Sequence, residues 1–196
     1  MTVLKTYFSY FINAFVLYPF QLYFALWVFP PLAGVENLPT FAGFVLQFLI
    51  MILIEDFASY WIHRMFHTPL LYKFHKQHHS QSDTTMVSAA NDHWIDYSVV
   101  VNVPFLSGLF LLHNYIHIAT LNVFLIFHVW IIMEVHCGYE SSWNFFASFP
   151  FLVNTTYHSY HHTHNIGNYS AYLTIWDTLF KTNKDFYEYV KEKKEK

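Results

Sequence analysis

Closely spaced histidines are the feature of this sequence with the clearest chemistry. Five of its 14 histidines lie in WIHRMFHTPLLYKFHKQHHS, residues 61–80, and a second group lies about eighty residues later in YHSYHHTH, residues 157–164. Spacings of i,i+3 and i,i+4 place the rings on one face of a helix. Neutral imidazoles bind metal ions, whereas clustered protonated imidazoles repel one another. The sequence therefore predicts a metal centre built from histidine.

The predicted ligands are too many for one zinc ion, which takes three or four. They are His63, His67, His75, His78, His79, His93, His136, His158, His161 and His162. Two ions with four or five histidines each fit this number. Imidazole binds zinc, copper, nickel and iron alike. A site that opens toward a hydrocarbon-lined cavity favours an oxygen-activating iron pair, whereas zinc would give hydrolysis or a structural role.

Acidic residues are expected behind these histidines, and no catalytic residue is predicted beyond the ligands. Asp56 precedes His63 by seven residues, so it shares a helix face with it at membrane depth, where a buried acid needs a partner. We expect its carboxylate to accept an imidazole N–H and fix the ring tautomer; pairing with Tyr60 is the alternative. Further candidates for this role are Asp177, Glu55 and Glu134. His128 is expected to be a buried hydrogen-bonding residue that could line a substrate cavity.

Hydropathy predicts four membrane-spanning helices. The chain is 55% hydrophobic, 22% aromatic and only 12% charged, which is too apolar for an ordinary soluble domain. Apolar runs near the roughly 20 residues that cross a bilayer occur at 8–29, 41–61, 95–112 and 116–135, followed by a tail at 137–196. We expect one all-α domain over residues 1–196, an integral membrane four-helix domain with a cytoplasmic histidine-rich cap.

Basic residues predict the orientation of these spans. All ten Lys and Arg residues fall on the side of the termini and the histidines, so the positive-inside rule makes that side cytoplasmic. A single cysteine fits a reducing compartment, and a net charge of −3 gives no indication of nucleic-acid binding. The segment 143–153 is too short to span and contains Pro150, so we expect it to lie in the cytoplasmic interface.

Three histidine boxes, HRMFH, HKQHH and HSYHH, resemble those of the sterol desaturase and fatty acid hydroxylase superfamily of integral membrane di-iron enzymes. Within it, the sequence is most similar to the 4-methylsterol monooxygenases. That likeness is carried by IEDFASYWIHRMFHTPLLYKFHKQHH, VHCGYE and NIGNYSAYLTIWDTLFKT. The resemblance covers residues 41–182.

The resemblance implies an oxygen-dependent enzyme with two iron ions in the boxes, although zinc could replace iron in a purified form. It implies electrons from NAD(P)H through cytochrome b5 and its reductase. The implied substrate is a sterol or another lipid, with a methyl group at carbon 4 oxidised in sterol biosynthesis. The final KKEK resembles a di-lysine retrieval signal, which implies the endoplasmic reticulum membrane with both termini cytoplasmic.

Three positions depart from the family's pattern and leave the substrate open. Ser159 replaces an acidic residue, AANDHWID replaces an AEYAHPxE-like stretch, and Lys181 replaces a glycine. One alternative is another lipid-modifying member, a sterol desaturase or a fatty-acid or sphingolipid hydroxylase. The alternative from a different class is a non-catalytic metal-binding membrane protein.

Overall fold

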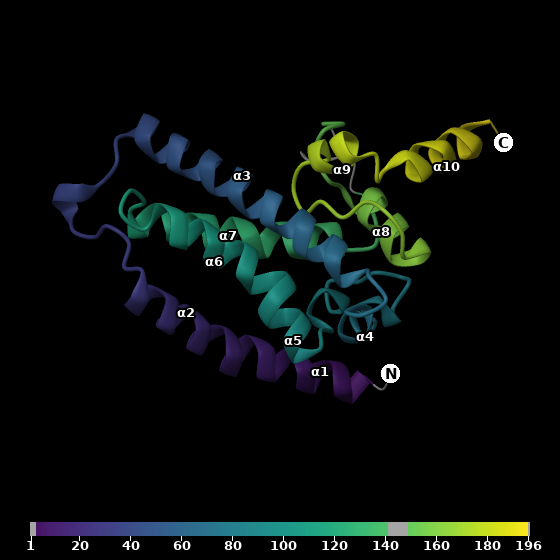
Figure 1. The fold of residues 1–196 in the computed structure, drawn as a ribbon, viewed down its shortest axis with the longest axis horizontal. Helices are drawn as coiled ribbons and strands as arrows, with labels where there is room; N and C mark the ends of the chain where they lie inside the picture. Colours follow the sequence, from purple (N-terminus) through teal and green to yellow (C-terminus); the bar gives the residue numbers. More distant parts are fainter. Residues whose placement is uncertain (1–2, 141–148, 196) are drawn as a thin grey trace.

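The computed structural model describes residues 3–140 and 149–195, and this part of the chain is helical (Figure 1). Its α-helices are α1 Val3–Ile12, α2 Tyr18–Val28, α3 Phe41–Phe66, α4 Tyr72–His75, α5 Trp94–Asp96, α6 Val103–Leu112, α7 Ile118–Val135, α8 Thr155–His164, α9 Ile175–Phe180 and α10 Lys184–Lys194. Two isolated β-bridges are the only extended pairs within these ranges. Most of the expected interfacial segment 143–153 lies outside the described residues.

Four helical stretches are long and apolar enough to cross a membrane. They are Thr6–Val28, Phe41–Phe66, Trp94–Leu112 and Ile118–Val135. Short π-helical turns, Asn13–Leu17 and Tyr97–Asn102, make the first and third stretches continuous. The predicted all-α architecture with four spans is therefore confirmed. The second span is longer than the apolar run because α3 continues as a helix through its polar end.

Both chain ends and the segments that carry the predicted ligands lie at the same end of the helical bundle. In Figure 1, α4 and α8 lie at the end nearest the N and C labels, whereas the α2–α3 and α6–α7 connections lie at the opposite end. Each span therefore begins or ends beside the histidine-rich region. This arrangement brings sequence segments that are tens of residues apart to one end of the bundle.

The helices α3 and α6 pack closely because α6 carries a glycine at their contact. A Cβ added at Gly108 would lie 2.6 Å from Sδ of Met51, a fully buried residue. Phe105, Leu109 and Phe124 are also buried in this core. Lipid tails are as apolar as these side chains, so close van der Waals packing, rather than removal from water, holds membrane helices together. The packed core fixes the spacing of the helix ends that carry the site.

Candidate metal centre

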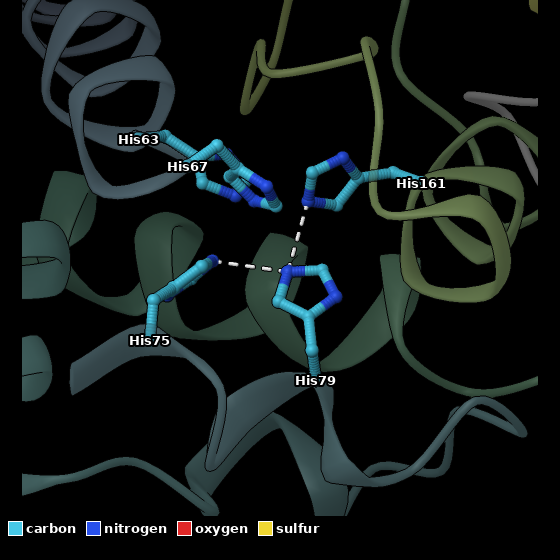
Figure 2. Close-up of side chains that lie close together, drawn as sticks. All are labelled: His63, His67, His75, His79 and His161. Carbon is cyan, nitrogen blue, oxygen red and sulfur yellow. Dashed lines mark hydrogen bonds between the residues drawn. The ribbon is translucent and has the colours of Figure 1, made fainter. Parts of the chain in front are cut away.

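Nine of the ten predicted ligands converge in two clusters, each with its ligand nitrogens within 4.8 Å of one another. The five-histidine cluster contains His63, His67, His75, His79 and His161, and the four-histidine cluster contains His78, His136, His158 and His162. Figure 2 shows the five rings of the first cluster directed toward a common centre. These counts match the expectation of four or five histidines for each of two ions.

Helical spacing divides the second and third histidine boxes between the two clusters, whereas both histidines of the first box belong to the five-histidine cluster. In α8, His161 faces the five-histidine cluster, whereas His158 and His162, one turn apart, face the other. The α8 helix is held in register by Asn154, whose Oδ1 accepts the Tyr157 N–H at 2.9 Å as an N-cap. Residues 75–79 divide in the same way, because His78 faces away from its neighbours. The two clusters are therefore adjacent and built on shared elements.

Three backbone carbonyls fix the tautomers of the histidines they contact. The Nδ1 atoms of His63, His136 and His161 lie 2.9, 2.7 and 2.6 Å from the carbonyl oxygens of Tyr169, Ile132 and Gly167, respectively. A carbonyl oxygen only accepts, so each Nδ1 carries the proton and donates it. Each Nε2 is therefore left with a lone pair.

Two buried aspartates hold two further histidines. The Nδ1 atom of His75 lies 2.8 Å from Oδ1 of Asp96, and that of His78 lies 2.8 Å from Oδ1 of Asp92. The Asp96 contact is a hydrogen bond, whereas the Asp92 contact is a close approach that lacks hydrogen-bond geometry. A carboxylate hydrogen-bonded to an imidazole orients the ring and raises its basicity as a ligand. Neither acid was predicted from the sequence. The available signal was two acidic residues four apart at the start of the third span, on either side of His93.

Lone pairs face one another across each cluster. His79 Nε2 lies 3.0 Å from His75 Nε2 and 3.1 Å from His161 Nε2. One proton on His79 satisfies only one of these two contacts, whereas a cation satisfies both. The Nε2 atoms of His63 and His67 are buried and have no hydrogen-bond partner in the described part of the chain. Buried polar atoms without partners are rare, so the donor set fits a pair of metal ions.

Burial keeps these imidazoles neutral. Burial, together with the neighbouring imidazoles, lowers the pKa of His67 to about 2 and that of His136 to about 3. The pKa values of His75, His158 and His161 are lowered well below the usual range for the same reasons. Neutral imidazole is the form that binds metal ions, and no proton must be displaced from it at neutral pH.

Asp56 and Asp177 support the clusters through the backbone instead of by contacting an imidazole. Asp56 accepts the N–H groups of residues 171–173 and the Trp176 indole N–H, at 2.7–3.1 Å. Asp177 accepts the N–H groups of Tyr169 and Ser170 at 2.9 and 2.8 Å. The expected imidazole contact to Asp56 is absent among the described residues, because that face of α3 packs against the segment 169–176. Both carboxylates hold the segment whose Tyr169 carbonyl orients His63.

His93 lies outside both clusters. Its Nδ1 accepts the Ile95 N–H at 3.2 Å and caps α5, and its ring lies 5.4 Å from the Phe74 ring. Asp92 and Asp96 turn toward the histidines, and the ring between them faces another direction. The structure therefore brings together nine of the predicted ligands and separates the tenth from them.

One cavity adjoins the clusters, and a second cavity shares lining residues with it. The smaller, of about 100 Å³, is lined by His63, His75, His78, His136 and His158 among others. The larger, of about 440 Å³, lies between the first span and α7 and is lined mainly by apolar and aromatic side chains. Ala89, Val101, His128 and Ile132 line both cavities. An apolar molecule in the larger cavity would therefore lie next to the smaller cavity that the clustered histidines line.

Histidine clusters at one end of four membrane-spanning helices agree with the family to which the chain is related in sequence. Residues 48–182 match the fatty acid hydroxylase family, so the chain belongs to that family. The match begins within α3 and ends beyond α9, so it contains all nine clustered histidines.

Among its relatives, the chain is 27% identical to the C-4 methylsterol oxidase of Schizosaccharomyces pombe, over 84% of the chain and 58% of that protein. It is 30% identical to methylsterol monooxygenase 1 of Gallus gallus, over 82% of the chain and 53% of that protein. It is 28% identical to methylsterol monooxygenase 1-1 of Arabidopsis thaliana, over 76% of the chain and 50% of that protein. The chain spans about half the length of these curated relatives. No solved structure shows significant similarity to it.

Proposed function

We propose that this chain forms the metal-binding membrane domain of an oxygen-dependent monooxygenase that oxidises a methyl group at carbon 4 of a sterol. The observation that carries the proposal is the pair of clusters, with five and four histidines, beside a largely apolar cavity. The names of the relatives, methylsterol monooxygenase and C-4 methylsterol oxidase, support the choice of reaction.

Iron is the proposed metal, with the five-histidine and four-histidine clusters each holding one ion. A bound iron pair would supply the activation of dioxygen needed to attack an unreactive C–H bond. The chain's own contribution is positioning. Backbone carbonyls and Asp96 hold four imidazoles in the tautomer that presents Nε2, and Asp92 lies beside Nδ1 of a fifth, His78. The apolar cavity would bind the lipid and exclude water from it.

The electron donors and the location are also proposals. We propose that electrons come from NAD(P)H through cytochrome b5 and its reductase, which would approach the histidine-bearing end of the bundle. All ten Lys and Arg residues are expected on the membrane side where the clustered histidines lie. This distribution supports a cytoplasmic location for the clusters and for both termini. The C-terminal KKEK supports the endoplasmic reticulum membrane.

Expression in a strain that lacks its own 4-methylsterol oxidase tests the reaction. Loss of accumulated 4-methylsterols, together with two iron ions per purified chain, is the expected result. Persistence of 4-methylsterols with new hydroxylated or desaturated lipids would identify a different lipid-modifying member of the family. A protein filled with zinc under iron-replete conditions, without oxygen consumption in the presence of a reducing partner, would indicate a non-catalytic metal-binding role.

Substitution of one ligand tests the site itself. His78→Ala should abolish activity and leave membrane insertion intact, because His78 belongs to the four-histidine cluster at the end of the bundle. His113→Ala is the matched control, since His113 lies in the α6–α7 connection at the opposite end. Full activity in His78→Ala would contradict the proposed ligand set.

A further inference from the structure

A buried acidic side chain, Glu55, lies within the spans near the two histidine clusters but belongs to neither of them. Glu55 on α3 is 1% exposed. Its Oε1 accepts the Tyr172 hydroxyl at 2.7 Å and pairs with His128 Nδ1 on α7. Ionisable side chains inside a membrane are costly to place there and commonly mark functional sites. Glu55 is a predicted support for the ligands, but among the described residues its side chain bonds none of the nine clustered histidines.

Two oxygen atoms in this region have no partner. Oε2 of Glu55 and the hydroxyl of Tyr18 are both buried, and neither makes a hydrogen bond to any described residue. Tyr18 and His128 line the same cavity, and His128 pairs with Glu55, so the two oxygen atoms border one region. Buried polar atoms in proteins are almost always paired, so an unpaired donor and an unpaired acceptor in one region call for a ligand that serves both.

These atoms lie where the two cavities meet. Tyr18 lines the larger apolar cavity, and Glu55 lines the smaller cavity beside the clusters. His128 lines both, and the other three residues common to the two cavities are apolar: Ala89, Val101 and Ile132. A lipid that extends from the larger cavity toward the histidines would therefore pass His128, which pairs with Glu55.

We propose that this junction binds the hydroxyl group of an otherwise apolar lipid, which would donate to Oε2 of Glu55 and accept from the hydroxyl of Tyr18. The proposal rests on the proposed function and names the polar group by which the lipid is held. His128 and Tyr172 are positioning residues, because they bind Oε1 and so direct Oε2 toward the junction.

The chemistry of the junction distinguishes a hydroxyl from other polar groups. A ketone could accept from Tyr18 but would leave the Glu55 oxygen unpaired. A fatty-acid carboxylate would be repelled by Glu55 in a region of low dielectric constant. A hydroxyl both donates and accepts, so it satisfies both atoms. Sites built to bind a hydroxyl discriminate strongly against analogues that lack it.

Equilibrium binding to the full chain in lipid nanodiscs tests the proposal. The probes are 4,4-dimethylcholestanol and its 3-deoxy analogue, each measured by competition with a fluorescent sterol. We expect the hydroxylated lipid to bind roughly tenfold more tightly, as for a hydrogen bond to a charged group. Tyr18→Phe should reduce this preference several-fold and leave binding of the deoxy analogue unchanged. Its folding should be unaffected, because the removed hydroxyl bonds no described residue of the chain.

Tyr23→Phe is the matched control, since Tyr23 lies on the same helix, is 73% exposed and lines neither cavity. Glu55→Gln is a second test variant. If Glu55→Gln does not fold, the comparison of the wild type with Tyr18→Phe still tests whether the junction binds the lipid hydroxyl. Equal affinity for the two lipids in the wild type, or an undiminished preference in Tyr18→Phe, would overturn the proposal.

Binding requires no turnover, so the two proposals fail separately. A chain that prefers the hydroxylated lipid but oxidises no sterol contradicts only the proposed function. A chain that oxidises 4-methylsterols but binds both probes equally contradicts only the hydroxyl site.

Discussion

His75 and Asp96 form a buried pair in which Nδ1 lies 2.8 Å from one carboxylate oxygen and 3.0 Å from the other. Both side chains are at most 2% exposed, so water does not compete for this contact. The pair joins the five-histidine cluster to the start of the third span. Asp96 thereby contributes to the cluster without being one of its ligands.

Asp96→Asn should weaken metal binding at the five-histidine cluster by roughly 10- to 100-fold, the usual effect of losing a carboxylate behind a histidine ligand. The amide cannot supply the negative charge that raises imidazole basicity. Iron content after titration with a chelator measures the effect. Asp83→Asn, at an exposed position, is the control. Identical chelator curves for Asp96→Asn and the wild type would show that the pair does not influence the metal.

Substitutions within α8 should remove different ions. His161→Ala deletes a ligand of the five-histidine cluster, and His158→Ala deletes a ligand of the four-histidine cluster. We expect each variant to retain about one iron per chain rather than two, with different iron spectroscopic signatures. Metal analysis combined with Mössbauer spectroscopy separates the two cases. The same residual spectrum in both variants would contradict the division of ligands.

Asp56→Ala should destabilise the protein, because it leaves four N–H groups in the segment 171–176 without their acceptor. Each unsatisfied buried donor costs about 1–3 kcal/mol, so the total loss of stability should be on the order of 3 kcal/mol or more. Thermal unfolding in detergent measures the change. Glu36→Gln, at an exposed position between α2 and α3, is the control. An unchanged unfolding temperature for Asp56→Ala would show that the segment is held by other contacts.

Gly108→Val should separate α3 from α6 and cost about 1–3 kcal/mol, as is typical of overpacked positions. The added atoms would overlap the side chain of Met51, which has no solvent-filled space to enter. Combining the change with Met51→Ala should recover part of this loss, and a double-mutant cycle on unfolding measures the coupling. Purely additive effects of the two substitutions would argue against direct contact at this position.

The parts of the site that depend on short stretches of sequence were predicted better than the contacts between residues far apart in the chain. The four spans and nine converging histidines follow from hydropathy and helical periodicity, which are properties of short stretches of sequence. The role of Asp56 did not, because its partners lie 115 or more residues away along the chain. Asp92 and Asp96 were missed for a related reason. Their pairing with His78 and His75 depends on how the segment after α4 folds back onto the third span.

His93 shows the limit of placing residues by depth alone. Its position next to the membrane suggested a ligand, but the direction of a side chain is set by the local backbone. The chain enters α5 at this residue, and its ring caps the helix. Membrane depth correctly indicated that residues 92–96 lie beside the clusters. The local backbone directs Asp92 and Asp96, rather than His93, toward the histidines.

The division of the second and third histidine boxes between two clusters means that the two clusters are mechanically linked. His78 and His79 are consecutive residues that serve different clusters, so tilting or sliding of that turn would carry both positions together. The separation between the two clusters would then persist while the surrounding helices flex with the bilayer. If each cluster holds one ion as proposed, fluctuations of the membrane would move the two ions together, which suits a reaction that needs a constant distance between them.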